Sequence, residues 1–81
     1  MNIKILGTGC PKCKLLEEYV KKAIETSGID ATVEKITDIN KIIEYGIMST
    51  PGLVIDEKVV SSGKILSIQE IVTKIMNTKI D

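Results

Sequence analysis

Two cysteines separated by two residues are the side chains with the clearest reactive chemistry in this sequence. They lie in the order Cys10-Pro11-Lys12-Cys13, and the 81-residue chain has no other cysteine and no histidine. Without histidine, every His-based triad and every zinc or iron site that needs histidine is excluded, and two cysteines supply only half of a tetrahedral metal site. The chemistry that remains is that of thiols, carboxylates and lysines.

The place of the pair in the chain favours reactive thiols. A short strand is expected just before the pair and an amphipathic helix just after it. Proline is tolerated at the first helical turn, which would put Cys10 at the N-cap and Cys13 near the third helical residue. The unpaired amides and the dipole at a helix start favour an anion and lower the pKa of a thiol, and Lys12 adds positive charge. We therefore expect Cys10 to be the nucleophile and Cys13 the resolving thiol.

The spacing of the two cysteines suggests a dithiol–disulfide cycle. The Cys10 thiolate would attack a substrate disulfide, and Cys13 would then attack Cys10 and release the reduced substrate. Three other interpretations remain open: an inert pair, half of a metal site, or a structural disulfide whose loop is too short to stabilise much.

The cysteine pair must be positioned by the strands and helices of the fold, and the sequence predicts where these lie along the chain. Hydrophobic periodicity, glycines and helix caps predict strands at residues 2–6, 31–36, 53–55 and 59–60, with helices at 11–27, 39–45 and from 68 onward. Asp38 is the predicted N-cap of the second helix, and Ser67 with Glu70 forms a capping box before the third. Strands joined through a helix are parallel, whereas a closing hairpin is antiparallel. We expect one α/β domain over residues 1–81, ordered β-α-β-α-β-β-α, with a four-stranded mixed sheet covered by three helices.

A second motif, Ser49-Thr50-Pro51-Gly52, lies immediately before the third predicted strand. With Gly9-Cys10-Pro11-Lys12-Cys13 upstream and Ser62-Gly63 before the last helix, the chain resembles the thioredoxin and glutaredoxin superfamily over essentially its whole length. More narrowly, it is similar to the small thioredoxin-like redox-active disulfide proteins of archaea and some bacteria.

This resemblance implies a thioredoxin-like fold and a set of site residues. Pro51 would be a cis-proline packed against the cysteine pair, and the backbone of Thr50 would pair with the substrate chain by strand addition. The remaining expected substrate contacts are Gly9, Pro11 and Lys12. In this chain Gly9 stands where thioredoxins usually carry a tryptophan.

The charge balance narrows the possible partners. Eleven lysines match 11 acidic residues, so the formal net charge is zero, and no basic stripe is present that would bind nucleic acid. The N-terminus lacks a signal-peptide pattern, and no apolar run approaches the ~20 residues of a membrane span. We expect a cytoplasmic monomer with neither membrane nor nucleic-acid partners and without a cofactor. The resemblance implies disulfide-containing protein substrates and an electron donor of the thioredoxin reductase type.

Two alternative functions would use the same pair. Small soft-metal chaperones for Cu(I) or Zn(II) also place Cys-x-x-Cys at a first strand–helix junction, but their element order is β-α-β-β-α-β, which the helix predicted after Asp38 argues against. A redox sensor specialised for one partner would cycle the same disulfide, and the sequence does not separate it from a general reductase.

Overall fold

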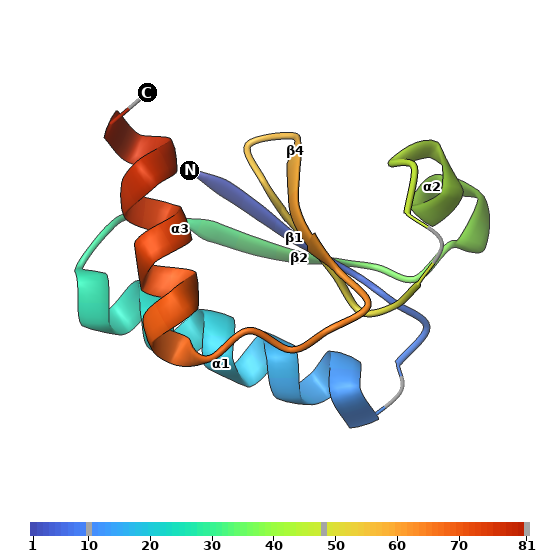
Figure 1. Cartoon of the computed structure of the whole chain (residues 1–81), viewed down its shortest axis with the longest axis horizontal. Helices are drawn as coiled ribbons and strands as arrows, with labels where there is room; N and C mark the ends of the chain where they lie inside the picture. The colour runs from blue at the N-terminus through green and yellow to red at the C-terminus, as the bar shows by residue number, and fades with distance from the viewer. Residues whose placement is uncertain (10, 48, 81) are drawn as a thin grey trace.

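The computed structural model of the chain describes residues 1–9, 11–47 and 49–80, and of residues 79 and 80 only the backbone. Over this part the elements follow the predicted order: β1 (Asn2–Leu6), α1 (Pro11–Ser27), β2 (Thr32–Ile36), α2 (Ile39–Glu44), β3 (Gly52–Ile55), β4 (Lys58–Ser62) and α3 (Ile68–Ile80) (Figure 1). None of the helices within these residues is long and apolar enough to cross a bilayer.

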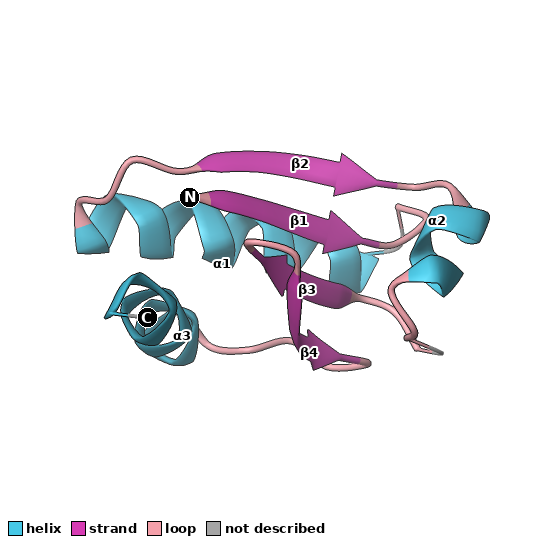
Figure 2. Cartoon of the chain, turned by 90° about the horizontal axis from the view of Figure 1, so that it is seen from above, coloured by secondary structure: helices cyan, strands magenta, loops and turns pink. Residues whose placement is uncertain are grey.

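The strands of the described chain form one mixed sheet in the order β2-β1-β3-β4. The central strand β1 runs parallel to β2 and antiparallel to β3, and β3 runs antiparallel to β4. The predicted α/β fold with a four-stranded mixed sheet and three helices is confirmed. Because β1 and β2 end where β3 begins, the loops that leave the first two strands and the loop that enters the third lie at the same end of the sheet (Figure 2).

The helices cover the two faces of the sheet unequally. Side chains alternate between faces along a strand, so Ile3 and Ile5 point to one face and Lys4 and Leu6 to the other. The first face carries the main core, in which the sheet packs against α1 and α3; its buried members are Ile3, Ile5, Leu16, Val20, Ala23, Leu53, Ile55, Leu66, Ile71 and Ile75. The second face carries a smaller core under α2, made by Leu6, Ile42, Ile47 and Val54.

The helix ends are capped as the sequence predicts. The Asp38 carboxylate accepts a hydrogen bond from the Asn40 amide at 2.9 Å at the start of α2. Ser67 and Glu70 form the reciprocal bonds of a capping box before α3. Gly28 ends α1 with a φ of 69°, a left-handed angle that favours glycine.

The β3–β4 hairpin is tighter than expected. The pattern predicts three turn residues, but Lys58 already pairs with Ile55, so only Asp56 and Glu57 form the turn. Both have positive φ, 48° and 67°, as a two-residue type I′ turn requires. This turn places the Glu57 carboxylate within hydrogen-bond distance of Lys4 Nζ.

Candidate active site

Three loops and the start of α1 converge at one end of the sheet. Leu6 is paired with Gly52, and Gly52 with Ser62, so the three strands place these residues side by side. The chain therefore brings together Gly7, which follows Leu6, Pro51, which precedes Gly52, and Gly63, which follows Ser62. The N-terminus of α1 lies beside them because only a short loop joins it to β1.

The loop before β3 is held in place by the loop after β4. The Gly63 amide donates a hydrogen bond to the Pro51 carbonyl at 2.9 Å. A Cβ added to Gly63 would lie 2.8 Å from Cβ of Ser49, so the two loops are in close backbone contact. Pro51 is fully buried, Thr50 is exposed, and the peptide bond between them is cis.

Cys13 lies in the first turn of α1 and is 6% exposed. Its sulfur packs against Gly7: a Cβ at Gly7 would overlap Cys13 Sγ and would lie 4.0 Å from Cβ of Thr50. Gly7 is therefore the point at which the end of β1, the thiol of Cys13 and the loop carrying Thr50 meet.

The charge around this point favours an anion. The first turn of α1 contains no acidic residue, and Lys12 and Lys14 are exposed there. The amide groups of a helix start carry partial positive charge, so this turn and its lysines stabilise negative charge on a nearby sulfur.

The other predicted site residues are placed as follows. Pro11 and Lys12 are exposed at the start of α1, and Gly9 is exposed with a φ of 92°. Cys10, the predicted nucleophile, lies outside the described residues, as does Met48. The structure thus brings Cys13 and Thr50 together around Gly7, with Pro51 next in the chain.

Sequence reasoning missed the role of Gly7. The run Gly7-Thr8-Gly9 predicts the end of the first strand, because glycine permits backbone angles that other residues resist. The left-handed residue is Gly9, whereas Gly7 is needed because a side chain there would displace the Cys13 sulfur. The signal in the sequence was a glycine directly after a buried strand, which often marks a close approach of another group.

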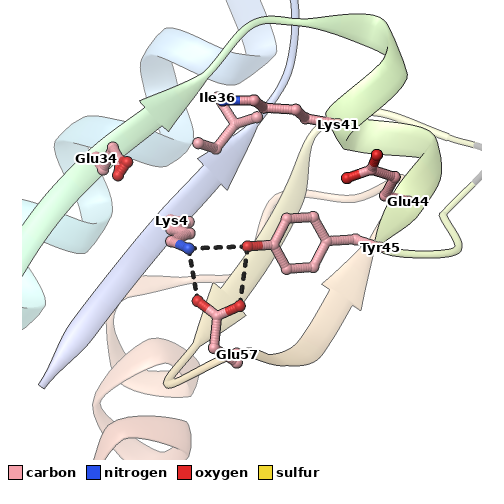
Figure 3. Close-up of a pocket in the computed structure, with 7 residues that line it drawn as sticks. All are labelled: Lys4, Glu34, Ile36, Lys41, Glu44, Tyr45 and Glu57. Atoms are coloured by element: carbon pink, nitrogen blue, oxygen red, sulfur yellow. Dashed lines mark hydrogen bonds and ion pairs between the residues drawn. The ribbon is translucent and has the colours of Figure 1, made fainter.

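A polar pocket lies on the second face of the sheet, and neither Cys13 nor any other residue of α1 is among its lining residues (Figure 3). Lys4 Nζ donates to the Tyr45 hydroxyl at 2.9 Å and pairs with Glu57 Oε1 at 2.5 Å, and the Tyr45 hydroxyl donates to Glu57 Oε2 at 3.2 Å. The hydrogen bond with Glu57, followed by that with Tyr45, raises the pKa of Lys4, and the same bond from Lys4 lowers the pKa of Glu57. We call Lys4, Tyr45 and Glu57 the polar triad; it connects β1, the end of α2 and the hairpin turn.

Comparisons with known proteins agree with the geometry of the site. A family model described as a thioredoxin domain matches residues 1–76, a range that includes both cysteines and the Thr50-Pro51 step. The chain is 52% identical over 69 residues to a protein named thioredoxin from Methanocaldococcus jannaschii. The aligned residues make up 85% of this chain and 79% of that protein. It is 41% identical over 71 residues to a protein named thioredoxin from Methanothermobacter thermautotrophicus, covering 88% of this chain and 92% of that protein.

Proposed function

Because the chain belongs to the thioredoxin family of thiol–disulfide oxidoreductases, we propose that it reduces disulfides in proteins through a dithiol–disulfide cycle of Cys10 and Cys13. The membership confirms the resemblance inferred from the motifs. The observation that carries the proposal is the burial of Cys13 in the first turn of α1, against Gly7. A thiol buried there is shielded from a substrate, as a resolving thiol should be, and it is three residues from the cysteine that directly precedes the helix.

The proposed cycle transfers two electrons in two exchange steps. The Cys10 thiolate attacks one sulfur of the substrate disulfide, the substrate S–S bond breaks, and the second substrate sulfur leaves as a thiolate that takes up a proton. The Cys13 thiol then loses its proton and attacks the Cys10 sulfur of the mixed disulfide. This step releases the reduced substrate and leaves a Cys10–Cys13 disulfide, which a donor of the thioredoxin reductase type returns to two thiols.

The surrounding residues have separate roles in this proposal. The α1 N-terminus and Lys12 stabilise the attacking thiolate. Thr50 is exposed and contacts the substrate chain, and the exposed Gly9 and Pro11 contribute further substrate contacts. Pro51 is buried, and its carbonyl accepts a hydrogen bond from Gly63, so it holds the Thr50 loop in place.

The soft-metal chaperone is a weaker candidate for the same cysteines. In the order expected of such chaperones, the third strand follows the second without a helix between them, whereas here α2 lies between β2 and β3. The partner-specific sensor would use the same exchange steps and differs only in the number of its substrates.

Replacing each cysteine by serine tests the proposal. With dithiothreitol as the electron source, Cys10→Ser should lower the rate of insulin disulfide reduction to the uncatalysed background. Cys13→Ser should retain the first attack but accumulate a mixed disulfide, visible by mass spectrometry as an adduct of the substrate. Lys21→Ser, a change of an exposed residue in the second half of α1, serves as a control and should reduce insulin at the wild-type rate.

Two results would contradict the proposal. One is a Cys10→Ser variant that reduces insulin at nearly the wild-type rate. The other is tight one-to-one binding of Cu(I) or Zn(II) by the reduced protein with no measurable disulfide exchange, which would favour the chaperone.

A further inference from the structure

The polar triad joins the end of a very short helix to the central strand of the sheet. Tyr45 is the C-cap of α2, and its hydroxyl accepts a hydrogen bond from Lys4 and donates one to Glu57, while Lys4 and Glu57 also pair directly (Figure 3). A lysine has only donors and a carboxylate only acceptors, so the tyrosine hydroxyl, which does both, bridges them. Each side chain of the triad therefore contacts the other two.

Few other contacts fix the position of α2. The helix has six residues, which is too short for it to be stable without tertiary contacts. Of its side chains only Ile42 is buried, whereas Ile39 is 59% and Ile43 is 63% exposed. A helix held at one buried side chain can pivot about it, so a second contact at its end is needed to fix its orientation. The triad supplies that contact through Tyr45.

The end of α2 leads directly into the loop that carries Thr50, which follows Tyr45 by five residues. Within this loop Ile47 is 7% exposed and packs in the smaller core, so close to β3 that a Cβ on Gly52 would lie 2.5 Å from its Cδ1. Because Ile47 shares this core with the buried residue of α2, it follows the helix when the helix pivots. At the far end of the loop, the Pro51 carbonyl is held by the loop after β4. The triad is therefore the anchor at the start of the Thr50 loop.

We propose that the polar triad positions the Thr50 loop for contact with the substrate chain, with Tyr45 as the positioning residue. This inference rests on the proposed function, in which the backbone of Thr50 pairs with the substrate by strand addition. Backbone hydrogen bonds weaken steeply when they are misaligned, so the loop must hold its binding geometry before the substrate arrives. When the binding-competent arrangement is populated only in part, the apparent affinity falls by that fraction.

The triad should affect binding and not the exchange chemistry. It lies on the second face of the sheet, whereas α1, whose first turn carries Cys13, packs on the first face. A change in the triad therefore reaches the site through α2 and the Thr50 loop, and the surroundings of the thiols stay as they are.

Tyr45→Phe tests the inference because it removes the hydroxyl and keeps the ring. The ion pair between Lys4 and Glu57 remains, so only the connection to α2 is lost. The matched control is Tyr19→Phe, the same change at the only other tyrosine of the chain, which lies on α1 and packs against the main core. Insulin is the protein substrate, with dithiothreitol as the electron source. The small disulfide of hydroxyethanethiol reacts with the reduced protein in a single turnover.

Tyr45→Phe should raise the KM for insulin about fivefold, the factor that one hydrogen bond of ordinary strength contributes, and should leave kcat at the wild-type value. The rate with the small disulfide, which is too short to pair with the Thr50 backbone, should not change. Amide exchange at Gly46, whose N–H donates to the Ile43 carbonyl at 2.8 Å, should become faster because the end of α2 loosens. Tyr19→Phe should match the wild type in all of these measurements.

Glu57→Gln, alone and combined with Tyr45→Phe, separates positioning from a direct effect of charge on the substrate. Glu57→Gln alone should raise the KM for insulin, because it weakens the triad. In the Tyr45→Phe background α2 is already disconnected, so Glu57→Gln should raise KM no further. A carboxylate that acted on the substrate directly would instead give effects that add.

An unchanged KM for insulin in Tyr45→Phe would overturn the inference, and so would an equal rise in Tyr19→Phe or additive effects in the double variant. A slower reaction of Tyr45→Phe with the small disulfide would overturn it as well, because the triad would then act on the thiols. If the wild type reduces neither insulin nor the small disulfide, the proposed function itself fails.

Discussion

At the scale of single residues, the candidate site depends on the absence of a side chain at Gly7. The Cys13 thiol occupies the space that a Cβ at Gly7 would need. The spacing of the two cysteines predicts the site, and the family resemblance adds Thr50 and Pro51; of these residues, the described structure places Cys13, Thr50 and Pro51 at one end of the sheet. The role of Gly7 could not be predicted, because the contact depends on how α1 packs against the end of β1.

Gly7→Ala should alter the redox chemistry as well as the stability. The added methyl group must displace the Cys13 sulfur or the end of β1, and overpacking of this kind costs about 1–3 kcal/mol of unfolding free energy. Either displacement changes the surroundings of the Cys13 thiol, so the reduction potential, measured by equilibration with glutathione buffers, should also shift.

Gly28→Ala is the matched control for this change. Gly28 has a left-handed φ of 69° with no atom within 4 Å of an added Cβ, so alanine there costs only the backbone strain, about 1–2 kcal/mol. Its reduction potential should equal that of the wild type. Identical potentials in Gly7→Ala and Gly28→Ala would show that Gly7 does not position the thiol.

At the scale of elements, α2 is the least embedded helix. The sequence correctly predicts its start at Asp38 and its stop before Gly46, but the spacing of Ile39, Ile42 and Ile43 does not tell which of them is buried. Only Ile42 is buried, because α2 covers one end of the sheet rather than its length (Figure 2). Tyr45, which follows the helix, connects it to the rest of the fold through the polar triad.

Glu57→Gln should weaken this connection in a pH-dependent way. The pKa of Glu57 is lowered in the folded protein by its hydrogen bond from Lys4. A lowered carboxyl pKa contributes stability above the unfolded value, about 4.3, and this contribution is lost as the pH falls through the folded value. The wild type should therefore be more stable than Glu57→Gln at pH 7, and the difference should shrink below about pH 4.3.

Urea unfolding at pH 7, 4 and 3 measures this difference, and Glu25→Gln, a change of an exposed carboxylate on α1, is the control. Because the Glu57 side chain is 62% exposed, added salt should also reduce the difference at pH 7. A difference that is constant with pH would mean that the charge of Glu57 does not contribute.

At the scale of the whole molecule, the sheet has a larger core against α1 and α3 and a smaller core under α2. The order of elements, the parallel β1–β2 pair and the closing hairpin could be predicted from periodicity and caps. The side of the sheet that each helix covers could not, because that depends on which strand faces are combined: Ile3, Ile5, Leu53 and Ile55 on one side, Leu6 and Val54 on the other.

Substitutions in the two cores should therefore differ in how much they lower the free energy of unfolding and in how much of the fold they loosen. Leu16→Ala, in the main core, should cost about 2–5 kcal/mol, a large part of the roughly 4–12 kcal/mol expected for a chain of this length. Ile42→Ala should destabilise less and should speed amide hydrogen exchange mainly in α2. Equal acceleration of exchange in α1 and α3 by Ile42→Ala would contradict this division.

The exposure of Ile39 and Ile43 has a practical consequence for engineering. Both side chains contribute little to the core, so they can be exchanged without endangering the fold that holds the cysteines. Because they line one surface together with Thr50, these two positions are suitable sites for randomised libraries that change the surface beside the candidate site.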